Sequence, residues 1–119
     1  MQLQEGPRSG VFGGRETGMA IMAISVTPVG TGSPSVGAYV AEAVRVLEES
    51  GLRYELRAMH TEVEGDLERL LALVPEIHRA CFALGAQRVS TVIKIDERRD
   101  APSSIAGKVR SVEHRRRRA

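Results

Sequence analysis

The alternation of apolar and polar positions in the first half of the chain predicts three strands and one helix. Apolar residues alternate with polar or small ones over residues 21–28, as is typical of a strand. Apolar residues from Val36 to Leu47 then recur at helical spacing, and Gly51 is the expected end of that helix. Residues 52–58 alternate again and predict a strand with one buried face, and residues 60–64 predict a short third strand.

The second half of the chain predicts two more helices with a strand between them. Asp66 is placed to cap a helix that ends near Gly85, and Pro75 is expected to interrupt and kink it. At about 100° per residue, the apolar side of this helix fills a sector of about 120°. Its members are Leu67, Leu70, Leu71, Val74, Ile77, His78 and Cys81. Residues 88–96 form the most regular alternation of the chain, and a last helix follows, capped by Ser103 or Ser104 and carrying Ile105, Val109 and Val112.

The predicted order of elements is β-α-β-β-α-β-α. This order matches an α+β fold, a ferredoxin-like antiparallel sheet with helices on one face and an extra C-terminal helix. Residues 1–18 hold five glycines and no apolar periodicity, so they predict a disordered leader before a domain over residues 19–114. Residues 115–119 predict a disordered basic tail. A protein trimmed to residues 19–114 is therefore expected to fold and bind like the full chain.

One face of such a sheet has no helix over it and needs another cover. The strands over residues 21–28 and 88–96, taken as the two central strands, are expected to carry apolar residues on both faces: Ile24, Val26, Val89, Val92, Ile93 and Ile95. Pairing of open faces between chains would bury these side chains. The sequence therefore predicts a homo-oligomer, with a tetramer as the preferred state.

The charge and the composition of the chain argue against nucleic acid and membrane as partners. The net charge of +2 depends on the four arginines at residues 115–118, whereas residues 19–114 carry 11 Lys or Arg against 13 Asp or Glu. With two Phe, two Tyr and no Trp, the chain also lacks the stacking surface of a nucleic-acid-binding sheet. No apolar run reaches the length of a membrane helix, and the single cysteine, Cys81, agrees with a reducing compartment. We therefore expect a cytoplasmic protein that binds neither nucleic acid nor membrane.

Candidate chemistry begins in the loop of residues 30–35, which reads Gly-Thr-Gly-Ser-Pro-Ser. Ser33 is a suitable helix N-cap, and Pro34 is a suitable first helical residue. The hydroxyls of Thr31, Ser33 and Ser35, beside backbone N–H groups at a helix N-terminus, predict a site for a small polar or phosphorylated ligand. A plain tight turn explains the same residues equally well. A dinucleotide fingerprint does not fit, because its third glycine is missing.

A second group of polar residues precedes the second long helix: Thr61, Glu62, Glu64 and Asp66. Carboxylates spaced by two on a strand share a face, and a carboxylate can accept hydrogen bonds from an amino-substituted ring. Glu64 is the residue that we assign to this contact, with Asp66 as the next candidate. A solvated acidic loop with a helix cap remains an open alternative.

His78 and Cys81 lie about one helical turn apart, at a spacing that allows two residues to share a metal ion. No second ligand pair with such spacing exists in the sequence, and both residues lie on the apolar side of their helix. A pair in the core or at an interface is therefore expected, and neither a metal nor a cofactor is predicted.

Three segments resemble the signature blocks of the small thiamine-binding protein family, in the family's order and with similar separations. They are residues 28–36 followed by Tyr39 and Val40, residues 59–66, and residues 88–100. The resemblance runs from Ala20 to Val112. It implies a ferredoxin-like fold, a tetrameric dimer of dimers, and binding of thiamine or its hydroxymethylpyrimidine moiety without an established catalytic activity.

Carried over by position, the resemblance implies a ligand site without catalytic residues or metal. Its members are Thr31, Ser33, Ser35, Thr61, Glu64 and Asp66. The residues taken alone leave a second hypothesis open, an oligomeric regulatory or scaffold protein whose loop binds no small molecule.

Overall fold

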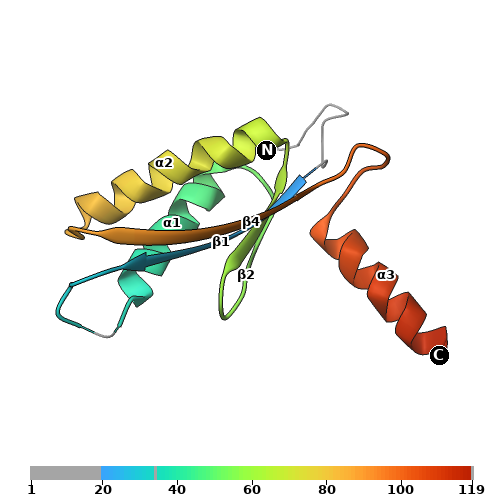
Figure 1. The fold of residues 1–119 in the computed structure, drawn as a ribbon, viewed down its shortest axis with the longest axis horizontal. Coiled ribbons are helices and arrows are strands. Elements are labelled where there is room, and N and C mark those ends of the chain that lie inside the picture. The colour runs from blue at the N-terminus through green and yellow to red at the C-terminus, as the bar shows by residue number, and fades with distance from the viewer. Residues whose placement is uncertain (1–19, 34, 119) are drawn as a thin grey trace.

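The computed structural model describes residues 20–33 and 35–118, so the predicted leader over residues 1–18 and the predicted helical role of Pro34 lie outside the described residues. The described chain forms four strands and three helices (Figure 1). They are β1 (Ala20–Pro28), α1 (Gly37–Ser50), β2 (Tyr54–Leu56), β3 (Thr61–Gly65), α2 (Leu67–Ala83), β4 (Val89–Glu97) and α3 (Ile105–Arg118). This is the predicted order, and it confirms the α+β, ferredoxin-like fold class.

The strands of the described chain form one antiparallel sheet in the order β2-β3-β1-β4. β1 pairs with β4 along its whole length, from Ala20 opposite Glu97 to Pro28 opposite Val89. On its other side, β1 pairs with β3 only over residues 20–24. The prediction that the β4 segment is a central strand was therefore wrong. β3 occupies one side of β1, and α2 carries the chain to the other side, where β4 becomes an edge.

Helices α1 and α2 pack against each other and against the same face of the sheet (Figure 1). Met22 and Val63 are register partners in the centre of this face, and neither is exposed to solvent. The rest of the buried cluster comes from β1 and the two helices: Ala20, Ile24, Val46, Leu47, Leu70, Leu73, Ile77 and Cys81. Burial of these apolar surfaces is the main favourable term in the stability of the domain.

The buried side of α2 differs in part from the predicted one. Leu73 is buried, whereas Leu71 is 44% exposed, because the helix turns the residues at 70, 73 and 77 toward the sheet. α2 continues through Pro75, which lies on the exposed side. Gly51 ends α1 in the left-handed conformation, with φ 79°, as predicted. No helix in the described ranges is long and apolar enough to cross a bilayer.

The open face of the sheet is more polar than the sequence led us to expect. The hydroxyl of Thr91 lies 2.6 Å from His78 Nε2 of α2, so the alternate β4 residues Val89, Ile93 and Ile95 also face the helix layer. Of the apolar residues named above for these strands, only Val92 points to the open face. Its neighbours there include Ser25, Thr27, Glu62, Lys94 and Asp96. An apolar open face was thus predicted wrongly, because register with β1 places these β4 side chains toward the helices.

α3 begins on the open side of the sheet and points away from it (Figure 1). Ser104 Oγ accepts a hydrogen bond from Gly107 N at 2.9 Å, which is the capping interaction predicted for this helix. Lys108 Nζ lies 2.8 Å from Asp96 Oδ2 of β4, so an ion pair also holds the first turns. Residues 115–118 form the last helical turn, so the prediction of a disordered stretch at these arginines was wrong.

Replacing Leu70 with Ala should lower the free energy of unfolding by about 2–5 kcal/mol, because the change leaves a cavity under α2. Leu84→Ala is the matched control, since Leu70 is fully buried and Leu84 is 45% exposed at the end of the same helix. Urea unfolding followed by circular dichroism gives both values. Equal losses for the two variants would contradict this account of the core.

Candidate functional site

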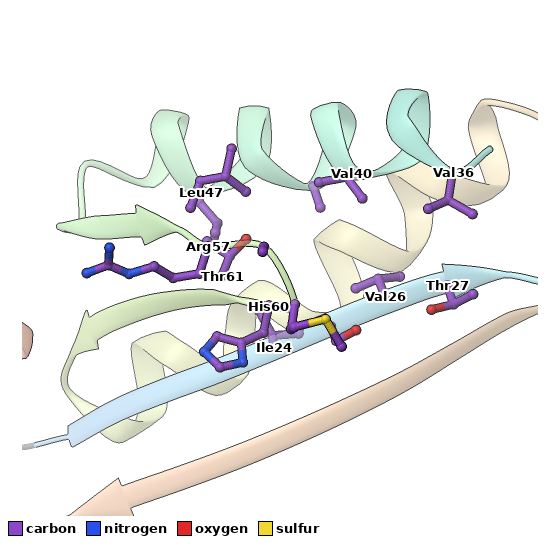
Figure 2. A pocket seen from close by; sticks show the side chains of 14 residues that line it. Ile24, Val26, Thr27, Val36, Val40, Leu47, Arg57, His60 and Thr61 are labelled. Carbon is purple, nitrogen blue, oxygen red and sulfur yellow. The ribbon is translucent and has the colours of Figure 1, made fainter.

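A pocket of about 150 Å³ lies between α1, the second half of β1 and the turn that joins β2 to β3 (Figure 2). Apolar side chains form most of its wall. Figure 2 shows Val36, the N-cap of α1, and Val40 within α1 on one side, and Val26 of β1 on the other. The lining comes from residues 24–27 of β1, residues 56–61 of the turn and its flanks, and Val36, Val40, Ala43 and Leu47.

The pocket exists because β3 is shorter than β1. The last pair between these strands joins Ile24 to Thr61, so residues 25–28 have no β3 partner. Val29 N donates to Arg88 O at 2.9 Å, which sets the alternation of the β1–β4 ladder. By that alternation, Val26 directs its backbone N–H and C=O away from β4 and toward the pocket. One wall of the pocket is therefore a strand edge that carries a hydrogen-bond donor and an acceptor.

Polar side chains are few and lie at the floor and the rim. Thr61 is 7% exposed and places its side chain on the same face as the helices. His60, which also lines the pocket, has Nε2 3.0 Å from Glu62 Oε2. Thr27 lies at the far end of the β1 wall (Figure 2). An apolar slot with a small number of placed polar groups is the usual form of a site for a small organic ligand.

The glycine-rich loop lies next to this pocket but does not line it. Gly30 and Gly32 adopt φ 79° and 81°, a region that residues with a side chain rarely occupy. Thr31 Oγ1 donates to Ser33 O at 3.1 Å, and Ser35 N donates to Ser33 Oγ at 3.1 Å. These three hydroxyl-bearing residues, Thr31, Ser33 and Ser35, are exposed and are joined to one another within the loop.

Helix α1 starts later than the loop sequence suggested. The N-cap is Val36 and the first helical residue is Gly37, so the prediction of Ser33 as the cap was wrong. The hydroxyl of Ser33 already accepts the Ser35 N–H, which closes the loop before the helix begins. Val36 is the residue that joins the loop to the pocket, since it caps α1 and lines the wall.

Glu64 and Asp66 do not line the pocket. Thr61 and Glu64 are three residues apart on β3, so they lie on opposite faces of the sheet, with about 10 Å of strand between them. Glu64 Oε2 accepts a hydrogen bond from Ile105 N at 3.0 Å, and Glu64 Oε1 lies 3.6 Å from Arg53 Nε. Asp66 is the N-cap residue of α2. The structure thus brings Thr61 into the pocket and the hydroxyl loop beside it, and it places the two carboxyl groups elsewhere.

Burial raises the pKa of Glu64 above its ordinary value, and the Ile105 N–H and Arg53 act in the opposite direction. Its side chain is only 11% exposed. Glu64 therefore acts as a cap for α3 that is supplied by a distant strand.

Sequence reasoning missed the apolar residues that form the pocket wall and the turn at its rim. Ile24, Val26 and Val40 follow strand or helix periodicity, which does not distinguish a pocket wall from a core. Met59 is 82% exposed and Leu56 is 56% exposed, although both are apolar. The sequence places these two apolar residues where the two predicted strands meet, but their exposure depends on the length of β3.

The pair His78 and Cys81 lies on the other side of the domain. His78 is bonded to Thr91, and its ring meets the Phe82 ring edge-on at 6.4 Å between centroids. Cys81 is fully buried in the core, and burial raises the pKa of its thiol. Within residues 20–33 and 35–118, no group of three or more His, Cys, Asp or Glu side chains is arranged to hold a metal ion.

Comparison with known proteins decides the family. The sequence model described as "Thiamine-binding protein" matches residues 22–113, which is most of the chain. The chain belongs to the thiamine-binding protein family. The match begins at Met22 within β1 and ends at Glu113 within α3, so the four arginines at 115–118 lie outside it.

Relatives of this family occur in bacteria, archaea and a fungus. The UPF0045 protein YqgV of Bacillus subtilis is 43% identical over 98 residues, which cover 79% of this chain and 94% of the relative. A solved domain of unknown function, DUF77, from Bacillus cereus is 38% identical with a TM-score of 0.70, and the match covers 78% of this chain and 88% of that one. A candidate thiamine biosynthesis or salvage protein from Thermotoga maritima, TM0486, shares the fold with a TM-score of 0.68 at 22% identity, over 78% of this chain and 97% of that one.

Glu64→Gln should leave the protein at least as stable as the parent at pH 7. The amide oxygen can still accept the Ile105 N–H, and no buried charge remains. The raised pKa means that folded Glu64 holds its proton to higher pH than unfolded Glu64 does. The parent therefore gains stability from this group as pH falls from above the raised pKa to below 4.5, the ordinary value.

Urea unfolding of both proteins between pH 4 and pH 8 measures the difference. Any advantage of the variant should shrink toward the acid end. A difference in unfolding free energy that stays constant with pH would show that Glu64 does not titrate in this way.

Proposed function

We propose that this protein binds thiamine or its hydroxymethylpyrimidine moiety in the pocket between α1 and β1, as a carrier, store or sensor, and does not convert it. The observation that carries the proposal is the bare backbone edge at Val26, set in an apolar pocket whose floor includes Thr61. Membership of the thiamine-binding protein family supports the choice of ligand.

The chemistry of the pyrimidine half fits this arrangement. An aminopyrimidine is a flat ring whose edge carries an exocyclic amine donor beside ring-nitrogen acceptors. The backbone C=O and N–H of Val26 offer the matching acceptor and donor in one plane, and the hydroxyl of Thr61 can do either. The side chains of Val36 and Val40 would cover the face of the ring, which makes desolvation of the ring favourable.

The size of the pocket favours one ring over the whole vitamin. Its volume of about 150 Å³ is below the roughly 300 Å³ at which sites for larger organic ligands begin. We therefore place the pyrimidine inside the pocket. The thiazolium ring of thiamine would extend out of it, past the rim formed by the β2–β3 turn.

We also propose that the protein works as a homo-oligomer, with a tetramer as the preferred state, in the cytoplasm. The tetramer rests on the family resemblance. The location is supported by the free thiol of Cys81, which a reducing compartment would preserve.

Calorimetric titration with hydroxymethylpyrimidine and with thiamine tests the binding. Thr61→Val keeps the shape of the side chain and removes one neutral hydrogen bond, worth about 1 kcal/mol, so affinity should fall about fivefold. Thr31→Val is the matched control in the exposed loop and should leave the affinity unchanged, as should Glu64→Gln. Mass spectrometry of the recovered ligand should show it unaltered.

Each opposite result points to a different error. If neither compound gives heat or a thermal shift with the parent protein, the ligandless scaffold replaces the binder. If Thr31→Val or Glu64→Gln weakens binding and Thr61→Val does not, the ligand lies at the residues implied by the sequence and outside the pocket.

A further inference from the structure

Two apolar side chains are exposed at the mouth of the pocket. Leu56, the last residue of β2, is 56% exposed, and Met59, in the turn before β3, is 82% exposed. Leu56 is the register partner of Thr61, so the two side chains lie on the same face of the sheet. Leu56 and Met59 both line the pocket and continue its apolar wall out to the surface. We refer to these two residues as the apolar rim.

The turn at residues 57–60 is closed at its base by one backbone hydrogen bond, in which Arg57 N donates to His60 O at 2.9 Å. Figure 2 shows Arg57 and His60 at one end of the pocket and Val36 at the other. The turn sequence, Arg-Ala-Met-His, has no glycine, proline, asparagine or aspartate, the residues that favour turns. Turn formation therefore does not explain an exposed Met59. Exposed apolar surface that is continuous with a pocket is typical of a binding groove.

The two rings of thiamine need different surroundings. The edge of the aminopyrimidine carries hydrogen-bonding groups, which the Val26 backbone and Thr61 can satisfy. The thiazolium ring has a quaternary nitrogen without an N–H, so it donates no such bond, and its positive charge is spread over a flat ring. A polarisable side chain suits a ring of this kind, since the methionine thioether makes favourable contacts with aromatic rings.

We propose that Met59, with Leu56 beside it, packs against the thiazolium ring and makes the site specific for thiamine over the free pyrimidine. This inference rests on the proposed function, in which the pyrimidine lies inside the pocket. The pocket volume of about 150 Å³ holds one ring. Because a single methylene joins the two rings, a pyrimidine bound at Val26 sets the thiazolium at the mouth. The unbranched side chain of Met59 can adapt its conformation to cover it there.

Positive charge at the mouth would repel a thiazolium ring, and neighbouring carboxylates offset it. Arg57 Nη2 lies 3.4 Å from Glu55 Oε1, and His60 Nε2 lies 3.0 Å from Glu62 Oε2. Both basic side chains in the pocket lining are therefore paired with a carboxylate. A cationic ring can then pack on the apolar rim without facing an uncompensated positive charge.

Calorimetric titration of the full-length protein with thiamine and with hydroxymethylpyrimidine tests this specificity. The parent should bind thiamine more tightly than the pyrimidine. Met59→Ala removes the thioether contact, so it should weaken thiamine binding about fivefold and change the affinity for the pyrimidine less than about twofold. Met59→Leu keeps an apolar side chain and should retain most of the thiamine affinity. Val112→Ala is the matched control, since Val112 is 60% exposed on α3 and does not line the pocket.

The outcomes separate this inference from the proposed function. If the parent binds the pyrimidine, but Met59→Ala weakens both ligands equally or leaves thiamine binding unchanged, the role of Met59 is wrong and the pocket assignment stands. If the parent binds neither compound, the proposed function fails and the specificity of the apolar rim fails with it.

Fluorescence can locate the thiazolium ring directly. The chain has no tryptophan, so Met59→Trp introduces a single reporter at the apolar rim. Thiamine should quench its emission in a saturable way, because a cationic aromatic ring would stack on the indole, whereas the pyrimidine alone should leave the emission nearly unchanged. Val112→Trp is the control and should respond to neither compound. Equal quenching by both compounds, or none by thiamine once calorimetry shows that the site is filled, would place the thiazolium away from Met59 and refute the proposal.

Discussion

The hydrogen-bond ladder of β1 is the interaction on which the rest of the structure depends. β1 pairs over nine residues with β4 and over five with β3, and both helices pack on one face of the sheet that this ladder builds. Because β1 pairs with more residues of β4 than of β3, residues 25–28 of this central strand have no strand partner on the β3 side. That stretch is the wall of the pocket. A fold that is otherwise ordinary thereby gains a place where main-chain groups meet an apolar surface.

The polar residues of β3 lie on two opposite faces of the sheet and have different roles there. Thr61 faces the helices and the pocket, whereas Glu64 faces the open side and caps α3 from a position 41 residues away in sequence. A carboxylate used in this way is costly to bury, but the N–H of Ile105 and the nearby Arg53 compensate in part. The first turn of α3 is consequently fixed to the sheet while the rest of the helix extends beyond it.

Local pattern was sufficient to predict most of the elements and insufficient to predict the site. The two-residue period of β1 and β4 and the helical period of α1 and α2 depend only on residues close together in the sequence. The order of the elements could therefore be predicted from the sequence alone. The start of α1 could not, because hydrogen bonds among Thr31, Ser33 and Ser35 close the loop before the helix begins. The pocket could not be predicted from local pattern, because it depends on where the pairing between β1 and β3 ends. Strand parity alone, however, separates Thr61 from Glu64, and that signal was present in the sequence.

The order of the strands also governs how a new chain reaches this structure. β1 is the first strand of the described chain, and the strand that pairs with it along its full length is the last. During synthesis, α1, β2, β3 and α2 therefore emerge while one side of β1 still lacks its neighbour. Contacts between segments so distant in sequence form slowly. Until β4 pairs with β1, the apolar surface that this contact will bury is exposed and prone to aggregation. Docking of β4 is thus the step at which we expect productive folding to compete with aggregation.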